Sequence, residues 1–311
     1  MKKSEINNSE NPLVTVIATS YNSGKYVVQL LDCIKLQTYK SIDLIIIDDL
    51  SSDNSVELID DWIKKNNYKC QFIKHTKNIG ASASCNEGLN LAKGKYICNN
   101  GDDLFEYDRF EKQVKLFNND DSIAFVCGNS ILIDENNNES GIYLPKDFTP
   151  PENIYLLLIS LDKGIVICTP TNLYNAEILK QEGGYTTHYL QEDYNVLMKL
   201  ARRHKIVYEN NFLVRYRVRH DSLGNSKKYL IRLRKDTLEV IMDVKPDNRE
   251  EKNAKKTGII TVLKSIYYHL NTDKFNEAEK NELYLVALNA IKYLKDNKLI
   301  QNLLISYLSF L

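Results

Sequence analysis

The first half of the sequence alternates short apolar runs with stretches of helical periodicity, and this alternation constrains the fold more than any other feature. Val14–Ala18 is rich in β-branched residues, which is typical of a buried strand, and apolar residues then recur at helical spacing from Tyr26 to Ile34. The same two patterns return in Leu44–Ile47 and Val56–Ile63. Strands that alternate with helices predict an α/β fold, with a mostly parallel sheet flanked by helices.

The alternation continues through Cys70–Ile73 and Tyr96–Cys98, which are predicted as strands on either side of a helix over Ala81–Ala92. Asp108 and Glu111 then have the spacing of a capping box at the start of a further helix. Right-handed crossovers place the carboxyl ends of all these strands at one edge of the sheet. Ligands of such folds bind at that edge.

The pattern weakens after residue 133, and the composition becomes lysine-rich from about Ser226. We therefore predict a flexible tail over residues 1–12, a ligand-binding α/β domain over 13–225 and a helical C-terminal region over 226–311. Lysine plus arginine and aspartate plus glutamate both number 41, so no excess of positive charge favours a nucleic-acid partner.

The remaining bulk features point to a cytoplasmic protein. The six cysteines are scattered without a Cys-x-x-Cys pair, which favours reduced thiols over a zinc site. The opening segment MKKSEINNSENP lacks the apolar core of a signal peptide, and no run approaches the ~18 apolar residues of a membrane span. We expect a cytoplasmic location, and contact with the inner face of the membrane remains compatible with this composition.

Two pairs of carboxylates follow predicted strands. Asp48–Asp49 ends the second strand, and Asn99–Asp103, with the sequence NNGDD, follows the fourth. Adjacent carboxylates repel each other and are best tolerated when they are exposed or when a cation sits between them and a ligand. Oxygen ligands suit Mg²⁺ or Mn²⁺, which typically also bind substrate phosphates. The alternative is that each pair is a solvated turn or a helix cap.

A third acidic pair, Glu192–Asp193, begins the helix that follows Gly183–Gly184. The electrostatic field at a helix N-terminus favours carboxylates, and this alone accounts for the pair. The functional alternative is a general base that takes the proton from an alcohol.

These motifs together resemble glycosyltransferase family 2 over about residues 13–222. The segments that carry the resemblance are VTVIATSYNSGKYV, LLDCIKLQTYKSIDLIIIDDLSSDNS, NIGASASCNEGLNLAKGKYICNNGDD and LQEDYNVLMKLARR. The resemblance implies a GT-A fold for the α/β domain. It also implies an inverting, hexosyltransferase-type reaction that moves a sugar from a nucleotide diphosphate to an acceptor hydroxyl in surface polysaccharide or glycan assembly.

The resemblance also implies which residues bind the donor. Thr19 and Asp49 are expected to contact the nucleoside, with Tyr21 beside them, and Asp102 is expected near the ribose or diphosphate. A uracil edge suits the contact with Asp49, so a UDP-sugar is the expected donor, and dTDP- and GDP-sugars are the alternatives.

Catalysis is assigned by the same resemblance. Asp103 is expected to hold Mn²⁺ or Mg²⁺ as the ligand of the family's "DxD" site, and Asp193 is expected to be the general base. His220, with Arg217 or Arg219 nearby, matches a late family stretch and is expected to approach the metal or diphosphate.

The sequence departs from the family at three positions. Asn100 stands where many relatives have the first Asp of the metal motif, so the metal would depend on Asp103, phosphate and water. Leu50 replaces the glycine that is usual after the Asp pair, and Tyr107 stands where proline is common. None of the three removes the expected base.

Two other functions compete with this interpretation. A sugar-phosphate nucleotidyltransferase usually shows a glycine-rich basic loop after the first strand, and TSYNSGKY is not such a loop. A non-catalytic nucleotide-sugar or carbohydrate-binding protein would not need Asp49, Asp103 and Asp193 together.

The expected partners are a nucleotide-sugar donor and a glycan or lipid-linked acceptor. The basic C-terminal helices are predicted to present a solvated face. The alternatives are a platform for an anionic lipid-linked acceptor at the membrane surface, or a homodimer contact. The basic residues concerned are Lys227, Lys228, Arg232, Arg234, Lys235, Lys255, Lys256 and Lys264.

Overall fold

The structure is a computed structural model that describes residues 11–162, 164–220, 227–272 and 276–294. The chain forms two compact units. The first contains the chain up to Thr149, Ile167–Thr187 and Lys199–Val218, and the second contains Pro150–Val166, His188–Met198 and the chain from Arg219 on. The predicted boundary at residue 225 lies outside the described residues and stays a prediction.

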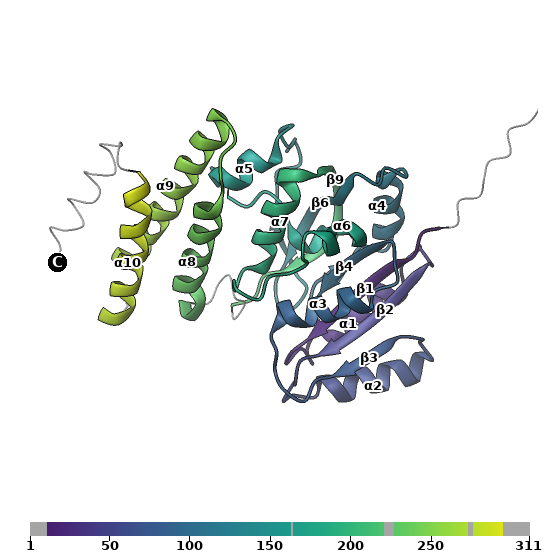
Figure 1. The fold of residues 1–311 in the computed structure, drawn as a ribbon. Helices are drawn as coiled ribbons and strands as arrows, with labels where there is room; N and C mark the ends of the chain where they lie inside the picture. Colours follow the sequence, from purple (N-terminus) through teal and green to yellow (C-terminus); the bar gives the residue numbers. More distant parts are fainter. Residues whose placement is uncertain (1–10, 163, 221–226, 273–275, 295–311) are drawn as a thin grey trace, which may run out of the picture. The chain divides into compact units, whose positions relative to one another are not determined.

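The first unit is built on one mixed sheet, in which the described residues contribute nine strands (Figure 1). The strand order is β3-β2-β1-β4-β8-β6-β9-β5, with β7 paired to β6. Strands β3, β2, β1 and β4 are mutually parallel, and β8 joins them to β6 through antiparallel pairs. The strands are β1 (Val14–Ser20), β2 (Ile42–Asp48), β3 (Gln71–Lys74), β4 (Tyr96–Asn100), β5 (Leu104–Phe105), β6 (Ile123–Ile133), β7 (Glu139–Ile142), β8 (Leu173–Asn175) and β9 (Lys205–Arg217).

Helices flank this sheet, as the alternation of apolar patterns predicted. Those of the first unit are α1 (Val27–Lys35), α2 (Ser55–Asn66), α3 (Ala81–Leu91), α4 (Arg109–Phe117), α6 (Ala176–Gln181) and the short η1 (Thr169–Thr171). Helix α7 (Glu192–Arg203) begins in the second unit and ends in the first. The expected α/β architecture is therefore confirmed.

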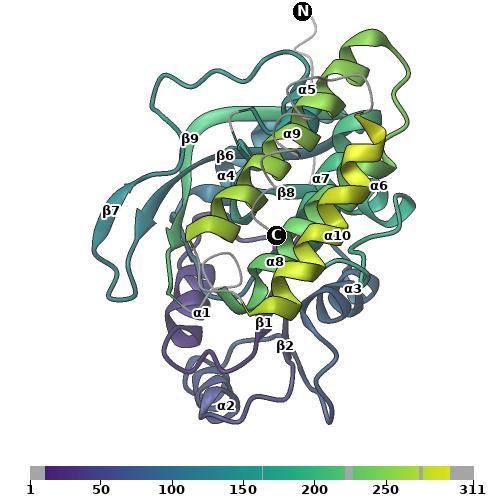
Figure 2. The same cartoon turned by 90° about the vertical axis from the view of Figure 1, so that its left-hand side faces the viewer.

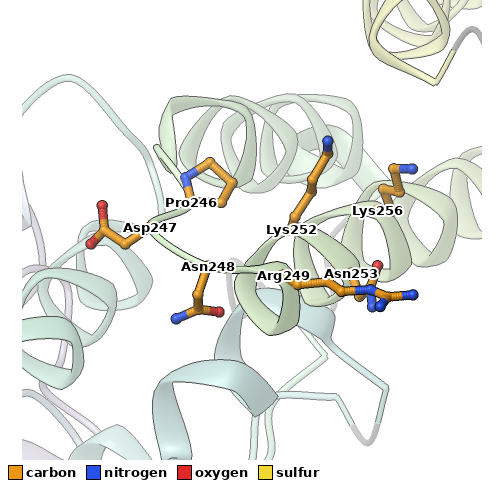
Figure 3. Close-up of a pocket in the computed structure, with 7 residues that line it drawn as sticks. All are labelled: Pro246, Asp247, Asn248, Arg249, Lys252, Asn253 and Lys256. Carbon is orange, nitrogen blue, oxygen red and sulfur yellow. The ribbon is translucent and has the colours of Figure 1, made fainter.

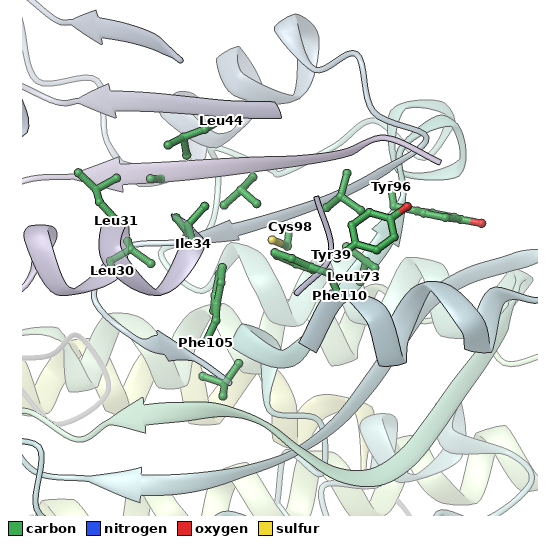
Figure 4. Packing of buried hydrophobic residues seen from close by; sticks show 14 of the residues in the cluster. Leu30, Leu31, Ile34, Tyr39, Leu44, Tyr96, Cys98, Phe105, Phe110 and Leu173 are labelled. Carbon is green, nitrogen blue, oxygen red and sulfur yellow. The ribbon is translucent and has the colours of Figure 1, made fainter. Parts of the chain in front are cut away.

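The alternation of side chains along β1 assigns its two faces. Val14, Val16 and Ala18 belong to one buried cluster with Leu30 of α1 and Phe110 of α4, part of which is drawn in Figure 4. This is the period of two expected when both faces of a strand are covered.

Helix α3 packs against β1 at Ile17, whose side chain lies outside that cluster. A β-carbon on Gly88 would come within 2.6 Å of the Ile17 side chain, so glycine is needed at this crossing. The helix thus approaches the sheet closely, just before the strand β4 that leads to the NNGDD segment.

The predicted capping box at α4 is wrong. Asp108 occupies the N-cap position, but its side chain makes no capping hydrogen bond and pairs with Lys112 at 2.8 Å instead. Glu111 accepts hydrogen bonds from Thr38 at 2.9 Å and from Lys115 at 2.9 Å. Nearby lysines and a threonine therefore compete successfully for both carboxylates.

The second unit is helical, with α5 (Ile154–Ser160), α8 (Lys227–Asp243), α9 (Arg249–Thr272) and α10 (Glu277–Tyr293). Helix α9 packs on both α5 and α8, and α10 packs on α8 (Figure 2). The close approach of α5 and α9 depends on Gly258, because a β-carbon there would overlap the carbonyl oxygen of Ile159. Within the described part of the chain, every helix is too short or too polar to cross a membrane.

Candidate functional site

The carboxyl ends of β1, β2 and β4 meet at one edge of the sheet in the first unit. Ser20 of β1 pairs with Asp48 of β2, and Ala18 pairs with Asn100 of β4. A β-carbon on Gly101 would lie 3.7 Å from Thr19 Oγ1, so the NNGDD turn adjoins the end of β1. The structure therefore brings together the polar segments that the sequence placed at this edge.

Asp48 holds the loop that follows β2. Its side chain is buried and accepts hydrogen bonds from Ser20 Oγ at 2.8 Å, Ser51 N at 2.8 Å and Ser51 Oγ at 2.6 Å. A carboxylate whose oxygens are engaged in this way stabilises a turn. For Asp48, the turn alternative considered from the sequence is the one that fits.

Asp49 is also buried, and it fixes a second loop. Its Oδ1 accepts a hydrogen bond from Ile79 N and lies near His75 Nδ1, both at 2.8 Å, and its Oδ2 accepts from Gly80 N at 2.8 Å. A carboxylate oxygen can accept two hydrogen bonds, so Oδ2 keeps acceptor capacity. Asp49 can thus hold the loop over residues 75–80 and still accept one more hydrogen bond.

His75 joins Asp49 to Glu87 of α3. Its Nε2 lies 2.8 Å from Glu87 Oε2, so each ring nitrogen faces a carboxylate that can only accept. Burial lowers the pKa of His75, but the hydrogen bonds to Asp49 and Glu87 outweigh it, and the net shift is upward. Sequence reasoning missed His75 and Glu87, because a single histidine in a polar segment carries no local signal.

Asp103 is held differently from Asp48 and Asp49. It is only 5% exposed, and its Oδ1 accepts a hydrogen bond from the backbone N–H of Arg217 at 2.7 Å. Burial and the neighbouring charge of Asp102 raise the pKa of Asp103 well above its usual range, and Arg217 and Arg109 oppose this shift only in part. A buried carboxylate in this state is stabilised by any positive charge that reaches it.

Asn100 explains one departure from the family pattern. Its Oδ1 accepts a hydrogen bond from Asp103 N and its Nδ2 donates to Asp103 O, both at 3.1 Å. An aspartate at this position could accept but not donate, so the amide is the better brace for this buried turn.

Arg217 braces the same turn from β9. Its guanidinium is buried and donates to Asp102 O at 3.0 Å and to Asn137 Oδ1 at 2.7 Å. It also lies 4.4 Å from the ring centre of Tyr26, a cation–π distance. The sequence placed Arg217 only in the neighbourhood of the metal, whereas the structure shows it organising the Asp102–Asp103 turn.

The Asp102–Asp103 turn fits a divalent cation that takes most of its ligands from elsewhere. In the part of the chain that the structure describes, no group of three or more His, Cys, Asp or Glu side chains converges as a complete metal site. Oxygen ligands and an electrostatic need for positive charge are nevertheless both present at Asp103. Such a cation would complete its coordination with substrate phosphate and water.

Tyr21 and Leu50 border this edge of the sheet. The Tyr21 ring is 57% exposed, which leaves it open to a ligand. Leu50 has a φ of +67°, a left-handed conformation that glycine adopts far more easily than leucine. This conformation explains why glycine is usual at this position in the family.

The other predicted residues belong to the second unit. Asp193 is half-buried, and its Oδ1 accepts a hydrogen bond from Tyr194 N at 2.7 Å. His220 is exposed, and the side chain of Glu192 lies outside the described residues. The catalytic role of Asp193 and the metal role of His220 stay predictions.

A separate open pocket of about 730 Å³ lies at the start of α9 (Figure 3). Its lining is Pro246, Asp247, Asn248, Arg249, Lys252, Asn253 and Lys256. Lys255, which the sequence grouped with the basic surface, is buried instead and donates to Val244 O at 2.7 Å. The basic side chains that line this pocket are therefore Arg249, Lys252 and Lys256, and Lys264 is exposed further along α9.

Comparison with known proteins agrees with this architecture. Residues 15–183, more than half of the chain, match the family described as Glycosyl transferase family 2. An uncharacterized glycosyltransferase of Methanocaldococcus jannaschii is 29% identical over 233 residues, which cover 74% of this chain and 77% of that protein. In two further relatives the matched part covers 66% and 37% of the relative's own length.

Solved structures share the fold at low sequence identity. Residues 1–349 of Staphylococcus aureus TarS, in complex with UDP-GlcNAc, give a TM-score of 0.64 at 14% identity, covering 90% of this chain and 81% of that chain. The mannosyltransferase PcManGT from Pyrobaculum calidifontis, in complex with GDP-Man and Mn²⁺, gives 0.58 at 15% identity, covering 94% and 83%. With its GT-A fold and its family match, the chain belongs to glycosyltransferase family 2.

Proposed function

We propose that this glycosyltransferase is a metal-dependent, inverting enzyme that transfers a hexose from a UDP-sugar to an acceptor hydroxyl. The buried Asp103, beside Asp102 at the edge of the sheet, is the observation that carries the proposal. A carboxylate that burial and a like charge both disfavour is suited to a cation and a diphosphate.

The donor nucleoside is proposed to bind at Thr19, Tyr21 and Asp49. The remaining acceptor capacity of Asp49 suits a base with an N–H on its edge, which uracil, thymine and guanine all have. Among proteins of the same fold, TarS is described with UDP-GlcNAc and PcManGT with GDP-Man, so uridine and guanosine donors are both known in this architecture. We favour uridine because the family resemblance implies a contact between Asp49 and the base that suits a uracil edge.

The metal site is proposed at Asp103, with Asp102 near the ribose or diphosphate and His220 as a further ligand. A bound Mn²⁺ or Mg²⁺ supplies positive charge that stabilises the departing nucleoside diphosphate. The protein's own contribution is to hold the Asp102–Asp103 turn rigid, through the hydrogen bonds from Asn100 and Arg217. PcManGT is described with Mn²⁺, which supports a divalent cation in this fold.

Asp193 is proposed as the general base. It takes the acceptor's hydroxyl proton while the oxygen attacks the anomeric carbon and the bond to the diphosphate breaks, so the configuration inverts in one displacement. Loss of a general base typically lowers the rate by ~10²–10⁴-fold. Asp193→Asn keeps the shape of the side chain but removes its basicity.

The test combines turnover with donor affinity. We would first screen UDP-, dTDP- and GDP-sugars with Mn²⁺, with and without EDTA, for nucleoside diphosphate release. We would then measure turnover and calorimetric donor affinity for Asp193→Asn and Glu192→Gln. The proposal requires slow turnover with unchanged donor affinity in Asp193→Asn only. Full activity in EDTA, or an inactive Glu192→Gln beside a normal Asp193→Asn, would overturn the corresponding assignment.

The acceptor is proposed to be a glycan or lipid-linked sugar in surface polysaccharide assembly. The exposed Arg249 and Lys252, with the half-buried Lys256, suit an anionic membrane surface, where each basic residue contributes about 1 kcal/mol. Flotation with anionic liposomes at low salt tests this contact. Protein that stays at the bottom of the gradient would leave a glycan in solution, or a homodimer contact, as the role of this face.

A further inference from the structure

The segment that leads into helix α7 is attached to helix α8 by hydrogen bonds. Leu190 N donates to Asp236 Oδ2 at 2.6 Å, and the guanidinium of Arg232 donates to the carbonyl of His188 at 2.8 Å. The Tyr189 hydroxyl donates to Asp243 at 3.3 Å. Three consecutive residues before α7 therefore contact one face of α8. Asp193 is the second residue of α7 and follows this attached segment closely in the chain.

Asp236 is the centre of this attachment. Its side chain is 1% exposed, and Arg232 Nε lies 2.8 Å from Oδ1, close enough for an ion pair although the contact lacks hydrogen-bond geometry. A buried carboxylate needs such partners, and a charge-assisted hydrogen bond to a backbone N–H is both short and directional. Asp236 thus fixes the position of the Leu190 backbone.

The other side of Asp193 is also anchored. The Tyr194 ring is buried, and its hydroxyl donates to the carbonyl of Leu158 in α5 at 2.7 Å. Helix α5 in turn packs closely on α9 at Gly258. The backbone at Asp193 is therefore held between an anchor to α8 on one side and an anchor to α5 on the other.

We propose that the C-terminal helices position the catalytic residue Asp193, with Asp236 and Tyr194 as the positioning residues that connect them to helix α7. The inference rests on the proposed role of Asp193 as general base. A misplacement of about 1 Å at a reacting group can cost on the order of 10²-fold in rate. Loosening either anchor should therefore slow turnover without changing how tightly the donor binds.

The experiment compares Asp236→Ala, Asp236→Asn and Tyr194→Phe in the full chain. Hydrogen exchange of the peptide over residues 188–196 reports the anchors directly, whatever the substrate. Turnover is read as nucleoside diphosphate release from the best donor in the screen, and donor affinity is measured by calorimetry. Lys280→Ala is the control, because it removes a 3.0 Å hydrogen bond to Glu277 within α10 of the same unit and belongs to neither anchor.

We expect Asp236→Ala to speed exchange in this peptide about 10-fold or more and to lower kcat about 10- to 100-fold, with unchanged donor affinity. Asp236→Asn should recover part of both effects, since its amide oxygen can still accept the hydrogen bond from Leu190 N. Tyr194→Phe should behave as a milder version of Asp236→Ala, and Lys280→Ala should match the unmodified protein.

A double variant separates this inference from the proposed base. If Asp236 acts through Asp193, adding Asp236→Asn to Asp193→Asn should cause no further loss of turnover. A full additional loss, unchanged exchange in Asp236→Ala, or faster exchange with normal turnover would each overturn the inference and leave the base assignment intact. Near-normal turnover of Asp193→Asn would instead refute the base assignment, while the exchange data still decide whether Asp236 anchors the segment.

Discussion

The two acidic pairs at the edge of the sheet look alike in the sequence and differ in the structure. Asp48 and Asp49 accept hydrogen bonds from several backbone and side-chain groups, and each holds a loop in place. Asp103 receives one hydrogen bond, from the backbone of Arg217, and stays poorly compensated in its charged form. The hydrogen bonds of Asp48 and Asp49 thus stabilise two loops, whereas the buried charge of Asp103 is only partly offset by Arg217 and Arg109, and a bound cation would offset it further.

This difference shows how a functional carboxylate can be separated from a structural one. Both kinds are buried, so burial alone does not distinguish them. The number of hydrogen bonds that the protein donates separates them, because both oxygens of Asp48 are engaged, whereas Asp49 and Asp103 keep acceptor capacity for a ligand. Substitutions of Asp48 and Asp103 should therefore have opposite effects on stability and activity.

The largest effect is expected for Asp103→Asn. Loss of the cation's ligand should lower metal-dependent turnover by about 10²-fold or more, since metal stabilisation of a leaving group is worth several kcal/mol. The unfolding free energy should not fall, because a neutral amide is cheaper to bury than a poorly paired carboxylate and can still accept from Arg217 N. Turnover with Mn²⁺ and urea unfolding measure the two quantities.

A contrary result for Asp103→Asn would remove the contrast between the pairs. If the variant unfolded more easily and kept normal turnover, Asp103 would be a structural residue like Asp48. Mn²⁺ binding by calorimetry in the presence of UDP is the control, since it reports the site without an acceptor.

Asp48→Ala should act mainly on stability. It leaves the Ser20 and Ser51 donors without their buried acceptor, which should lower the unfolding free energy by roughly 2–4 kcal/mol. Ser51→Ala, which removes one of these donors, should cost less. Urea unfolding measures both variants, and a loss below about 0.5 kcal/mol for Asp48→Ala would mean that the loop does not depend on this carboxylate.

His75 should make stability depend on pH near neutrality. Its pKa is raised because the hydrogen bonds to Asp49 and Glu87 favour the charged ring more strongly than burial opposes it. The charged His75 ring therefore stabilises the folded protein fully below its unfolded pKa of about 6.5. This contribution is lost as the pH rises through the higher folded pKa. Unfolding followed from pH 6 to 9 should show this loss in the unmodified protein and less of it in His75→Gln.

Glu87→Gln refines the His75 measurement. With one carboxylate removed, the ring should titrate at lower pH, and NMR of the His75 ring protons would follow the shift. An unchanged titration would mean that Glu87 contributes nothing to the charged state of His75, and that Asp49 alone is its partner.

The sequence predicted the order of elements well because periodicity is local. Strands β1 to β4 and the helices between them follow from apolar spacing, and so does the meeting of their polar ends at one edge. It did not predict which carboxylates are paired, since the partners of Asp49 and Asp103 are His75 and Arg217, which lie 26 and 114 residues away. Nor could periodicity show that residues 188–198 group with the C-terminal helices.

The smallest effect is expected at Leu50, directly after the first pair. Its left-handed φ of +67° costs an L-residue roughly 1–2 kcal/mol, and its side chain is 46% exposed, so packing returns little. Leu50→Gly should raise the unfolding free energy by about 1 kcal/mol, after the greater freedom of glycine in the unfolded chain is subtracted. Leu50→Ala is the control, because alanine also disfavours this conformation and should give no such gain.

If Leu50→Gly lowered stability, the leucine side chain would be making a contact worth more than its strain. If it raised stability as expected, the hydrogen bonds of Asp48 and Asp49 would be shown to hold this loop against the local preference of its own residue.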